Sequence, residues 1–572
     1  MKAPLNHWNT HSRLWEVSPK DYLWAGEYCL EDNALAREIV LLHHTRSVDE
    51  QLKRHASGSR LFLKLLKTRL LTFEEFTYLK NIRTSPEKKT NCSPFALAYW
   101  MLIQSHPSNA LLSIHDDEET HFTELLKKWI PRTSTLFFRP EPVPFPLSAL
   151  HRHLIITGRT GSGKSQFMLT LFYQLQYHSN SKQQHAQVFL DPHGDISEKL
   201  LSLRLNAQNY QRLWYIDPSL SADKIPCINP FWEKVTNPVL TDLLAQQWAK
   251  AFSELIPEAG MSLQMEAILK PCLWVMFQKG NCGLFDLQIF MDDSQNQEWV
   301  ALGRASKNPV FRNFFEQSFL NKKYAPTKLA IFTRLQLLLN NYTFYQMMNG
   351  RSTVDLKQGM KQGKIMLFNL SKGKLGEDTS KALARFISAT LLSIALQRAF
   401  ESERNRKHCF LFADEFHNMA SSSMESVFSE ARKYHLHLIV GTQTVDQLPL
   451  SLKKMVLNNT AVKLVGINGL PALKSQAGDI GVSFAKLQQL APYQFYLKYD
   501  HYPALKIKSS DALIKHPRKY FLTSKATEGL VDYLLHKSGL YRTIDDPPVI
   551  TPPSNKTSPP PTDQSYKPQF EL

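Results

Sequence analysis

The sequence predicts an α/β fold built on a mainly parallel β-sheet. Short apolar runs alternate with helical patterns over residues 151–508, which is typical of strand–helix–strand units. Each run is continuously apolar, as expected for strands that are buried on both faces of a sheet. A glycine-rich turn follows the first run, and a helical pattern follows that turn. The predicted strands are LIIT, QVFLD, KIMLFNL, HCFLFAD, LHLIVGTQ and AVKLVG.

One stretch interrupts this alternation. Three of its segments carry apolar residues at helical spacing: PVLTDLLAQQWAKAFSELI, LQMEAILKPCLWVMFQ and PTKLAIFTRLQLLLNN. We therefore expect an all-helical insertion at residues 229–345. The α/β domain would then comprise residues 151–228 and 346–515.

The flanking regions differ from this core in composition and pattern. Helix-spaced apolar residues in NALAREIVLLHHTRSVDEQLKRH indicate a mostly helical N-terminal domain. A proline-rich stretch, FFRPEPVPFPLSALHRH, indicates a linker into the α/β domain, and the last residues are rich in Pro, Ser and Thr. The expected parts are a helical domain at 1–135, a linker at 136–150, a helical segment at 516–544 and a disordered tail at 545–572.

The composition limits the number of domains, the kinds of partner and the cellular compartments that we expect for this chain. A chain of 572 residues is long enough for about two to four domains. The net charge of +17, from 68 Lys+Arg against 51 Asp+Glu, favours a polyanionic partner such as nucleic acid or an anionic membrane surface. A generally basic, soluble surface is the alternative. The sequence has no secretory signal pattern and no apolar run near 18 residues, so we expect neither a signal peptide nor a membrane-spanning helix.

The cysteines point to a reducing compartment. They are scattered, without a CxxC pair or zinc-ligand spacing, so they indicate reduced thiols in a cytosolic protein. The six are Cys29, Cys92, Cys227, Cys272, Cys282 and Cys409.

The turn GRTGSGKS matches the phosphate-binding pattern G-x-x-x-x-G-K-[ST] in full, between a strand and a helix. Glycines let the backbone fold around phosphate oxygens, and the helix N-terminus adds partial positive charge. We expect Lys164 to reach the β- and γ-phosphates of ATP and the Ser165 hydroxyl to ligate Mg²⁺. The predicted loop consists of Gly158, Arg159, Thr160, Gly161, Ser162, Gly163, Lys164 and Ser165.

Three further strand ends supply the remaining parts of such a site. In HCFLFADEF, Asp414 is expected to hold Mg²⁺ and Glu415 to polarise the attacking water, a surface acidic pair being the alternative. Gln443 ends LHLIVGTQ, where it could orient that water or sense the γ-phosphate. Asp191 ends QVFLD, and either shapes the nucleotide pocket or only fixes its own turn.

Together these motifs resemble the HerA/FtsK superfamily of ring-forming P-loop motors, most closely the ATPases of type IV secretion and bacterial conjugation. The resemblance covers about residues 151–508 and implies a RecA-like P-loop NTPase core. It is carried by GRTGSGKS, FLDPHGD, GKIMLFNLSKGKLGEDTS, LFADEFHNM, SEARKYHLHLIVGTQ and LAPYQFYLK.

The resemblance implies a homo-hexamer that moves DNA through a central channel by ATP hydrolysis. It gives catalytic roles to Glu415, Gln443 and Lys164, and it implies an arginine that acts on a neighbouring subunit. Arg432 in SEARKYH is our candidate, and the alternatives are Arg398, Arg385 and Arg334.

The sequence also departs from the family. Many coupling proteins begin with membrane-spanning helices, which we do not expect here. The chain would then be cytoplasmic, or peripheral at the inner membrane through type IV secretion or relaxosome partners. The main hypothesis is an ATP-driven DNA translocase. The alternatives are a HerA-like repair motor with a nuclease partner, and an ATPase or adaptor for protein export whose turnover ignores DNA.

Overall fold

The computed structural model describes residues 22–29, 142–178, 184–255, 263–420 and 422–544. The chain divides into two compact units. The described residues of the small unit are 22–29, 142–146, 494–497 and 501–509, and the remaining described residues form the large unit.

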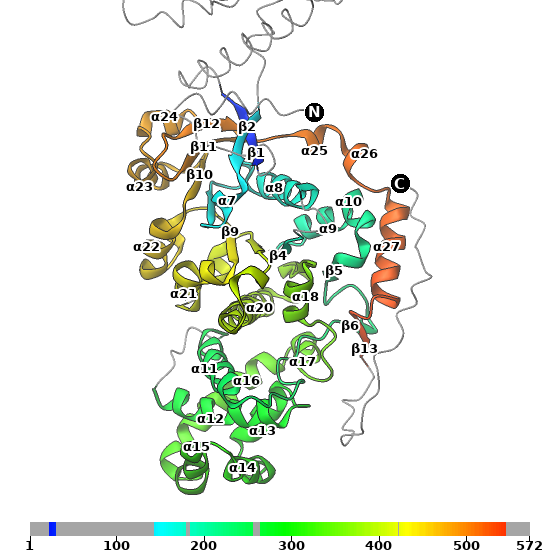
Figure 1. Cartoon of the computed structure of the whole chain (residues 1–572), viewed down its shortest axis with the longest axis vertical. Coiled ribbons are helices and arrows are strands. Elements are labelled where there is room, and N and C mark those ends of the chain that lie inside the picture. The colour runs from blue at the N-terminus through cyan, green and yellow to red at the C-terminus, as the bar shows by residue number, and fades with distance from the viewer. Residues whose placement is uncertain (1–21, 30–141, 179–183, 256–262, 421, 545–572) are drawn as a thin grey trace, which may run out of the picture. The chain divides into compact units, whose positions relative to one another are not determined.

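The large unit contains seven parallel strands that lie side by side (Figure 1). Their interior is apolar, and every residue of the four strands β4, β7, β8 and β9 is buried. This confirms the predicted mainly parallel α/β sheet. In spatial order the strands are β10 (Val462–Gly466), β3 (Leu154–Thr157), β9 (Leu436–Thr442), β8 (Cys409–Ala413), β4 (Ala186–Asp191), β7 (Ile365–Asn369) and β5 (Leu213–Ile216).

All six strands expected from apolar runs form, and β5 is an additional strand that the sequence did not predict. In the centre of the sheet, Ile155 of β3 pairs with Val440 of β9. Phe410 of β8 pairs with His437 of β9, and with Gln187 of β4. Because the strands are parallel, their carboxyl ends meet at one edge of the sheet and their amino ends at the opposite edge.

Helices connect these strands and cover the sheet, as Figure 1 shows for α8, α18 and α20. Helix α18 illustrates the local signals, since the Asp355 side chain caps its first turn and Gly363, with φ of 75°, ends it. The helices are α7 (Leu147–Leu150), α8 (Lys164–His178), α9 (Asp195–Leu201), α10 (Arg204–Gln208), α18 (Leu356–Gln362), α19 (Lys372–Leu375), α20 (Glu377–Gln397), α21 (Ser422–Glu430), α22 (Leu450–Asn459), α23 (Leu470–Ile480), α24 (Phe484–Gln488), α25 (Ala512–Lys515) and α26 (Pro517–Tyr520).

The helical stretch Glu377–Phe400 is long and apolar enough to cross a membrane by length and composition, although the sequence alone predicted no such helix. Most of its apolar window is buried within the protein. Phe386 of this helix packs against Trp248 at 4.8 Å between ring centroids. Core helices of globular domains have the same apolar character when they are covered on most sides.

The segment between β6 and α18 is helical, as the periodicity predicted. Its aromatic core gathers around Phe290, whose ring lies within 6 Å of the rings of Trp299, Phe315 and Phe319. Lys328 is buried here and pairs with Asp293. The helices are α11 (Pro238–Leu255), α12 (Leu263–Lys279), α13 (Leu284–Met291), α14 (Gln297–Arg304), α15 (Pro309–Asn313), α16 (Ala325–Leu339) and α17 (Tyr342–Met348).

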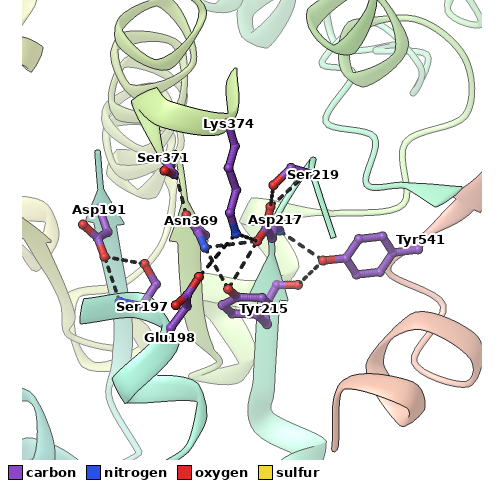
Figure 2. A network of polar contacts seen from close by, with 10 residues as sticks. All are labelled: Asp191, Ser197, Glu198, Tyr215, Asp217, Ser219, Asn369, Ser371, Lys374 and Tyr541. Carbon is purple, nitrogen blue, oxygen red and sulfur yellow. Dashed lines mark hydrogen bonds and ion pairs between the residues drawn. The ribbon is translucent and has the colours of Figure 1, made fainter. Parts of the chain in front are cut away.

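The C-terminal part of the large unit lies along the β5 side of the sheet in Figure 1. Helix α27 (Ser524–His536) precedes β13 (Arg542–Thr543), which pairs with β6 (Lys224–Ile225). The Tyr541 hydroxyl donates to the Tyr215 carbonyl at 2.8 Å and accepts from the Asp217 backbone N–H at 3.0 Å (Figure 2). The expected helical segment at 516–544 therefore contains helices and one short strand that is fastened to the sheet.

The small unit contains antiparallel strands in the order β2-β1-β12-β11: β1 (Tyr22–Tyr28), β2 (Pro142–Pro146), β11 (Gln494–Tyr499) and β12 (Leu505–Lys508). Gly26 sits at an irregularity in β1, where a Cβ would lie 2.3 Å from the Lys508 carbonyl oxygen. The described residues 22–28 of the expected helical domain thus form a strand, and residues 142–150 of the expected linker form β2 and α7. The rest of the N-terminal domain and the tail at 545–572 lie outside the described residues.

Candidate nucleotide-binding site

A pocket of about 650 Å³ opens at the carboxyl edge of the parallel sheet. Strands β3, β8 and β9, which are far apart in sequence, each deliver residues to it at their carboxyl ends. Every residue of the predicted phosphate loop except Gly158 lines this pocket, and so do the residues predicted at two other strand ends. Its lining includes Arg159, Thr160, Gly161, Ser162, Gly163, Lys164, Ser165, Asp414, Glu415 and Gln443.

The phosphate loop has a backbone that requires glycine at two positions. Gly161 and Gly163 have φ of 78° and 99°, a region that side chains with a Cβ rarely adopt. A Cβ at Gly163 would also lie 2.6 Å from the Tyr493 ring, whereas a Cβ at Gly161 would meet nothing within 4 Å. Helix α8 starts at Lys164, so its N-terminal N–H groups face the pocket.

The lysine of the loop is held in place. Lys164 is 5% exposed, and its ammonium donates to the Gly158 carbonyl at 2.7 Å. The loop itself is fastened to neighbouring segments, since the Arg159 N–H donates to the Ile467 carbonyl and the Tyr493 N–H to the Ser162 carbonyl, both at 2.9 Å. This ammonium group is nearly out of solvent and donates a hydrogen bond to a carbonyl, so it is well placed to exchange that hydrogen bond for contacts with anionic oxygens.

Ser165 and Asp414 form the pair that fits a hard divalent cation. The Ser165 hydroxyl donates to Asp414 Oδ2 at 2.8 Å, which joins the end of β8 to the first turn of α8. Burial raises the pKa of Asp414, and the nearby Glu415 carboxylate adds to this, against the Ser165 hydrogen bond and the Lys164 charge. A hydroxyl beside a carboxylate in this setting is the oxygen-donor set that Mg²⁺ uses.

Glu415 occupies a left-handed backbone conformation, with φ of 48° and ψ of 51°. Non-glycine residues in this region carry strain of order 1–3 kcal/mol and cluster at functional sites. Its Oε1 lies 3.9 Å from Lys164 Nζ, and His417 Nδ1 lies 3.4 Å from Oε2. Within the described part of the chain, Oε2 is buried and accepts no hydrogen bond. The carboxylate therefore places Oε1 near the lysine of the phosphate loop, while Oε2, beside His417, keeps lone pairs that accept no hydrogen bond from the described residues.

Gln443 directly follows β9 and completes the wall of the pocket. Its backbone carbonyl accepts from Asn468 Nδ2 at 2.5 Å, which fixes the strand end. The fold thus brings Lys164, Asp414 and Gln443, which the sequence assigned to one site, to the wall of the same pocket.

Asp191 does not line the pocket. It is fully buried, and its Oδ2 accepts from the Ser197 hydroxyl at 2.6 Å and from the Ser197 backbone N–H (Figure 2). Oδ2 also accepts from the Ile196 backbone N–H at 2.9 Å. Oδ1 accepts from the His193 N–H. The sequence left open whether Asp191 shapes the nucleotide pocket or only fixes its own turn, and these contacts match the second role. That turn places His193 and the start of α9 at the pocket wall.

The candidate arginines lie away from the pocket of their own chain. Arg432 is exposed in the turn before β9, at the amino edge of the sheet, and its charge acts on His151 and His153. Arg398 is buried and donates to the Lys407 and Tyr434 carbonyls. Of these two, only Arg432 is placed to reach another molecule. Two more candidate arginines are half-buried, Arg385 in α20 and Arg334 in α16.

The sequence did not predict several residues that line the wall of the nucleotide pocket. Tyr493 has φ of 66° and contacts the phosphate loop through both its backbone and its ring. Its signal was the stretch LAPYQFYLK, which carried the family resemblance but not a site role. His193, Asp195 and Lys199 also line the pocket, from the turn after β4 and from α9. Only the strand end at Asp191 was considered there, so the helix that follows it was overlooked.

Comparison with protein families supports the motif-based resemblance. Residues 138–391 match the family model described as "Helicase HerA, central domain". This range includes the phosphate loop, β4, β7 and the helical insertion, and it ends before Asp414. The predicted likeness to HerA-type P-loop proteins is confirmed over this range. No curated protein matched the chain.

Solved structures with similar folds come from secretion and conjugation proteins. The bacterial conjugative coupling protein TrwB in its unbound form is 14% identical, with a TM-score of 0.47, over 64% of this chain and 87% of that chain. TrwB in complex with ADP and Mg²⁺ is 16% identical, with a TM-score of 0.45, over 64% and 87%. VirB4 of Thermoanaerobacter pseudethanolicus is 14% identical, with a TM-score of 0.42, over 63% and 89%.

Proposed function

We propose that this chain is an ATP-driven DNA translocase of the conjugative or type IV secretion type, which works as a homo-hexameric ring. The observation that carries the proposal is the 2.8 Å contact between Ser165 and Asp414, beside Lys164 and Glu415 in one pocket. The HerA central-domain match and the motif resemblance support the motor class.

The chain's own groups divide the work of ATP hydrolysis. The loop N–H groups and Lys164 would bind the phosphates, with the Lys164 ammonium leaving the Gly158 carbonyl. Ser165 and Asp414 would hold Mg²⁺, which neutralises charge on the transferred phosphoryl group. Glu415 has a buried carboxylate oxygen that can accept a proton from the attacking water, and Gln443 can orient that water.

Arg432 is the proposed arginine in trans. It sits at the amino edge of the sheet and so cannot serve the pocket at the carboxyl edge of its own chain. An exposed arginine can enter a neighbouring pocket, where it stabilises the charge of the transition state. Hydrolysis would then depend on assembly, because one subunit supplies only part of the charge stabilisation.

DNA is the proposed substrate because the chain carries a net charge of +17 and no recognised base-reading motif. Contacts to phosphates do not depend on sequence, and they weaken steeply as salt rises. DNA movement would follow from loss of the γ-phosphate. This loss would loosen the interface between subunits, and loops that line the central channel would then shift along the DNA strand.

The test is the ATPase rate of the purified full chain against added single- and double-stranded DNA, with the mass of the assembly recorded in the same samples. We expect DNA to raise the rate, with the gain lost at high salt and tied to the ring-sized species. Hydrolysis that ignores DNA at low salt would contradict the translocase and favour protein export. Stimulation only by a nuclease partner at DNA ends would favour the repair motor.

A further inference from the structure

Six histidines gather at the amino edge of the parallel sheet, opposite the nucleotide pocket. They come from short segments that directly precede or begin four neighbouring strands. Four of the rings, those of His151, His408, His435 and His437, stack on one another, with centroids 4.1 Å apart for His151 and His408 and 4.3 Å apart for His408 and His435. The proposed function gives this cluster no role. Its members are His151, His153, His185, His408, His435 and His437.

Three of these rings bring ligand atoms together. His151, His408 and His437 each have a ring nitrogen within 4.8 Å of the other two. His408 Nδ1 and His437 Nε2 are 2.8 Å apart, and the rings of His151 and His437 stack at 4.7 Å between centroids. The three residues lie on segments separated by more than 250 residues in one case, so the fold alone assembles them.

The hydrogen bonds set the orientation of these nitrogens. His437 Nδ1 lies 3.1 Å from the His151 carbonyl, which can only accept, so Nδ1 carries the proton and Nε2 presents its lone pair to His408. His151 Nε2 is buried and has no hydrogen-bond partner within the described residues. Metal-binding histidines commonly donate their second ring N–H to a backbone carbonyl, as His437 does here.

We propose that His151, His408 and His437 form a binding site for a divalent transition-metal ion of the Zn²⁺ class, which fastens the starts of β3, β8 and β9 together. Tetrahedral ligation would hold the nitrogens about 3.4 Å apart, given Zn–N bonds near 2.0–2.1 Å. The hydrogen-bonded nitrogens of His408 and His437 must therefore move slightly apart, and the His151 ring must turn toward them. A water molecule would complete the fourth position.

Ligation needs no net loss of protons. In the hydrogen-bonded pair, His437 Nε2 accepts, so His408 Nδ1 donates its proton. His408 would bind the ion through Nδ1 after changing to the tautomer that is protonated at Nε2. Burial, aided by neighbouring positive groups, lowers the pKa of His151 to about 4 and that of His408 to about 3. The rings are thus neutral at physiological pH, which is the form that binds metal.

The charged groups around the three histidines determine which metal ions the proposed site can bind. The charges of Arg398 and Arg432 act on His408 and His151, and the three predicted ligands include no carboxylate. Repulsion from the guanidinium groups opposes any dication, and only an ion with strong bonds to imidazole offsets it. The site should therefore take Zn²⁺ or Co²⁺ and reject Mg²⁺, which prefers oxygen ligands.

The test uses the full chain, stripped with a chelator and free of nucleotide, so that Ser165 and Asp414 are not loaded. Zn²⁺ alone is titrated by calorimetry, and Co²⁺ is followed by its visible absorption. We expect one equivalent to bind and to raise the melting temperature, with no competition from excess Mg²⁺. His408→Gln and His151→Gln should each weaken Zn²⁺ binding by at least about tenfold.

His435→Asn is the matched control. Its ring stacks on His408, but its Nδ1 already contacts the Arg406 carbonyl at 2.6 Å, and asparagine tolerates its φ of 58°. This variant should bind Zn²⁺ as the unaltered chain does. ATP binding and circular dichroism check folding, and if His408→Gln does not fold, the half-buried His151→Gln decides. Equal Zn²⁺ affinity in the folded variants and the unaltered chain, or no binding to the unaltered chain, would overturn the proposal.

Discussion

The two edges of the parallel sheet in the large unit are chemically opposite. At the carboxyl edge, glycines, hydroxyls and carboxylates surround an open pocket beside the N-terminus of α8. At the amino edge, neutral imidazoles stack closely, and His437 is almost fully buried. A parallel sheet turns helix N-termini toward its carboxyl edge, so that edge attracts anions, while the amino edge can be filled by groups that pack. Changes to the stacked histidines should therefore have effects that are separable from those of changes in the pocket.

The largest effect is expected from Lys164→Ala at the carboxyl edge. The ammonium lines the pocket and is the charge that we propose binds the phosphates, so ATP turnover should become undetectable. A phosphate-release assay measures this, and the unfolding temperature of the nucleotide-free variant checks the fold. The matched control is Lys199→Ala, which removes another lysine from the pocket wall and should keep measurable turnover. Normal turnover by Lys164→Ala would exclude this pocket as the ATPase site.

Arg432→Ala tests whether the amino edge of one chain serves the carboxyl edge of another. Turnover in the assembled state should fall on the order of 10³-fold or more, with ATP binding retained. Mixing this variant with Lys164→Ala should restore activity, because mixed rings contain intact interfaces. Its exposed neighbour supplies the control, Lys433→Ala, which should stay active. A mixture that stays inactive would exclude Arg432 as the arginine in trans.

Glu415→Gln should lower turnover by about 10² to 10⁴-fold, the usual contribution of a general base. The amide is close to the carboxylate in size, so ATP should still bind and remain uncleaved. Single-turnover quenching with labelled ATP measures both steps. Glu430→Gln at the end of α21 is the control. Hydrolysis at the normal rate would show that another group activates the water.

Two glycine substitutions in one loop separate strain from steric overlap. Gly163→Ala places a Cβ against the Tyr493 ring, and Gly161→Ala places one in open space, although both have positive φ. ATP affinity should therefore fall more in Gly163→Ala than in Gly161→Ala. Fluorescent-nucleotide titration measures the difference, and equal losses would mean that backbone strain alone controls the loop.

The smallest effect is expected at the amino edge, as a dependence of stability on pH. The folded pKa of His151 is about 4 and that of His408 about 3, both below the ordinary value of 6.5. As the pH decreases from about 6.5 to about 4, these histidines bind protons in the unfolded chain but not in the folded chain. The free energy of unfolding therefore decreases as the pH decreases through this window. His408→Gln removes one such group and should flatten the slope. Melting temperatures over the window, with His435→Asn alongside, measure it, and an unchanged slope would contradict the assignment.

The sequence predicted the carboxyl edge well because each of its parts is a contiguous motif. LIITGRTGSGKS, CFLFADEF and LHLIVGTQ each combine an apolar strand with the polar residues that follow it, so the strand end and the chemistry can be recognised together. The helical insertion was visible for a similar reason, since its apolar spacing changes over long segments. Strand β5 was missed because LWYI is short and lacks a clear helical pattern after it.

The amino edge could not be predicted in this way. Its histidines occur singly or in pairs before separate strands, and only the order of the strands places them together. The left-handed backbone of Glu415 and the ring of Tyr493 against Gly163 were also invisible, because they depend on how loops meet in space. Asp191 was left open by sequence alone, since a carboxylate after a strand can face a ligand or fold back on its own N–H groups.

The hydrogen bonds of the Tyr541 hydroxyl have a consequence for solubility. Strand β5 is the last in the order of parallel strands, and an outermost strand can recruit strands from other chains. One phenol occupies both the Tyr215 carbonyl and the Asp217 N–H next to that border. Burial raises the pKa of Tyr541, so its hydroxyl stays protonated and able to donate. The segment around Tyr541 thus shields a border of the sheet that would otherwise favour aggregation.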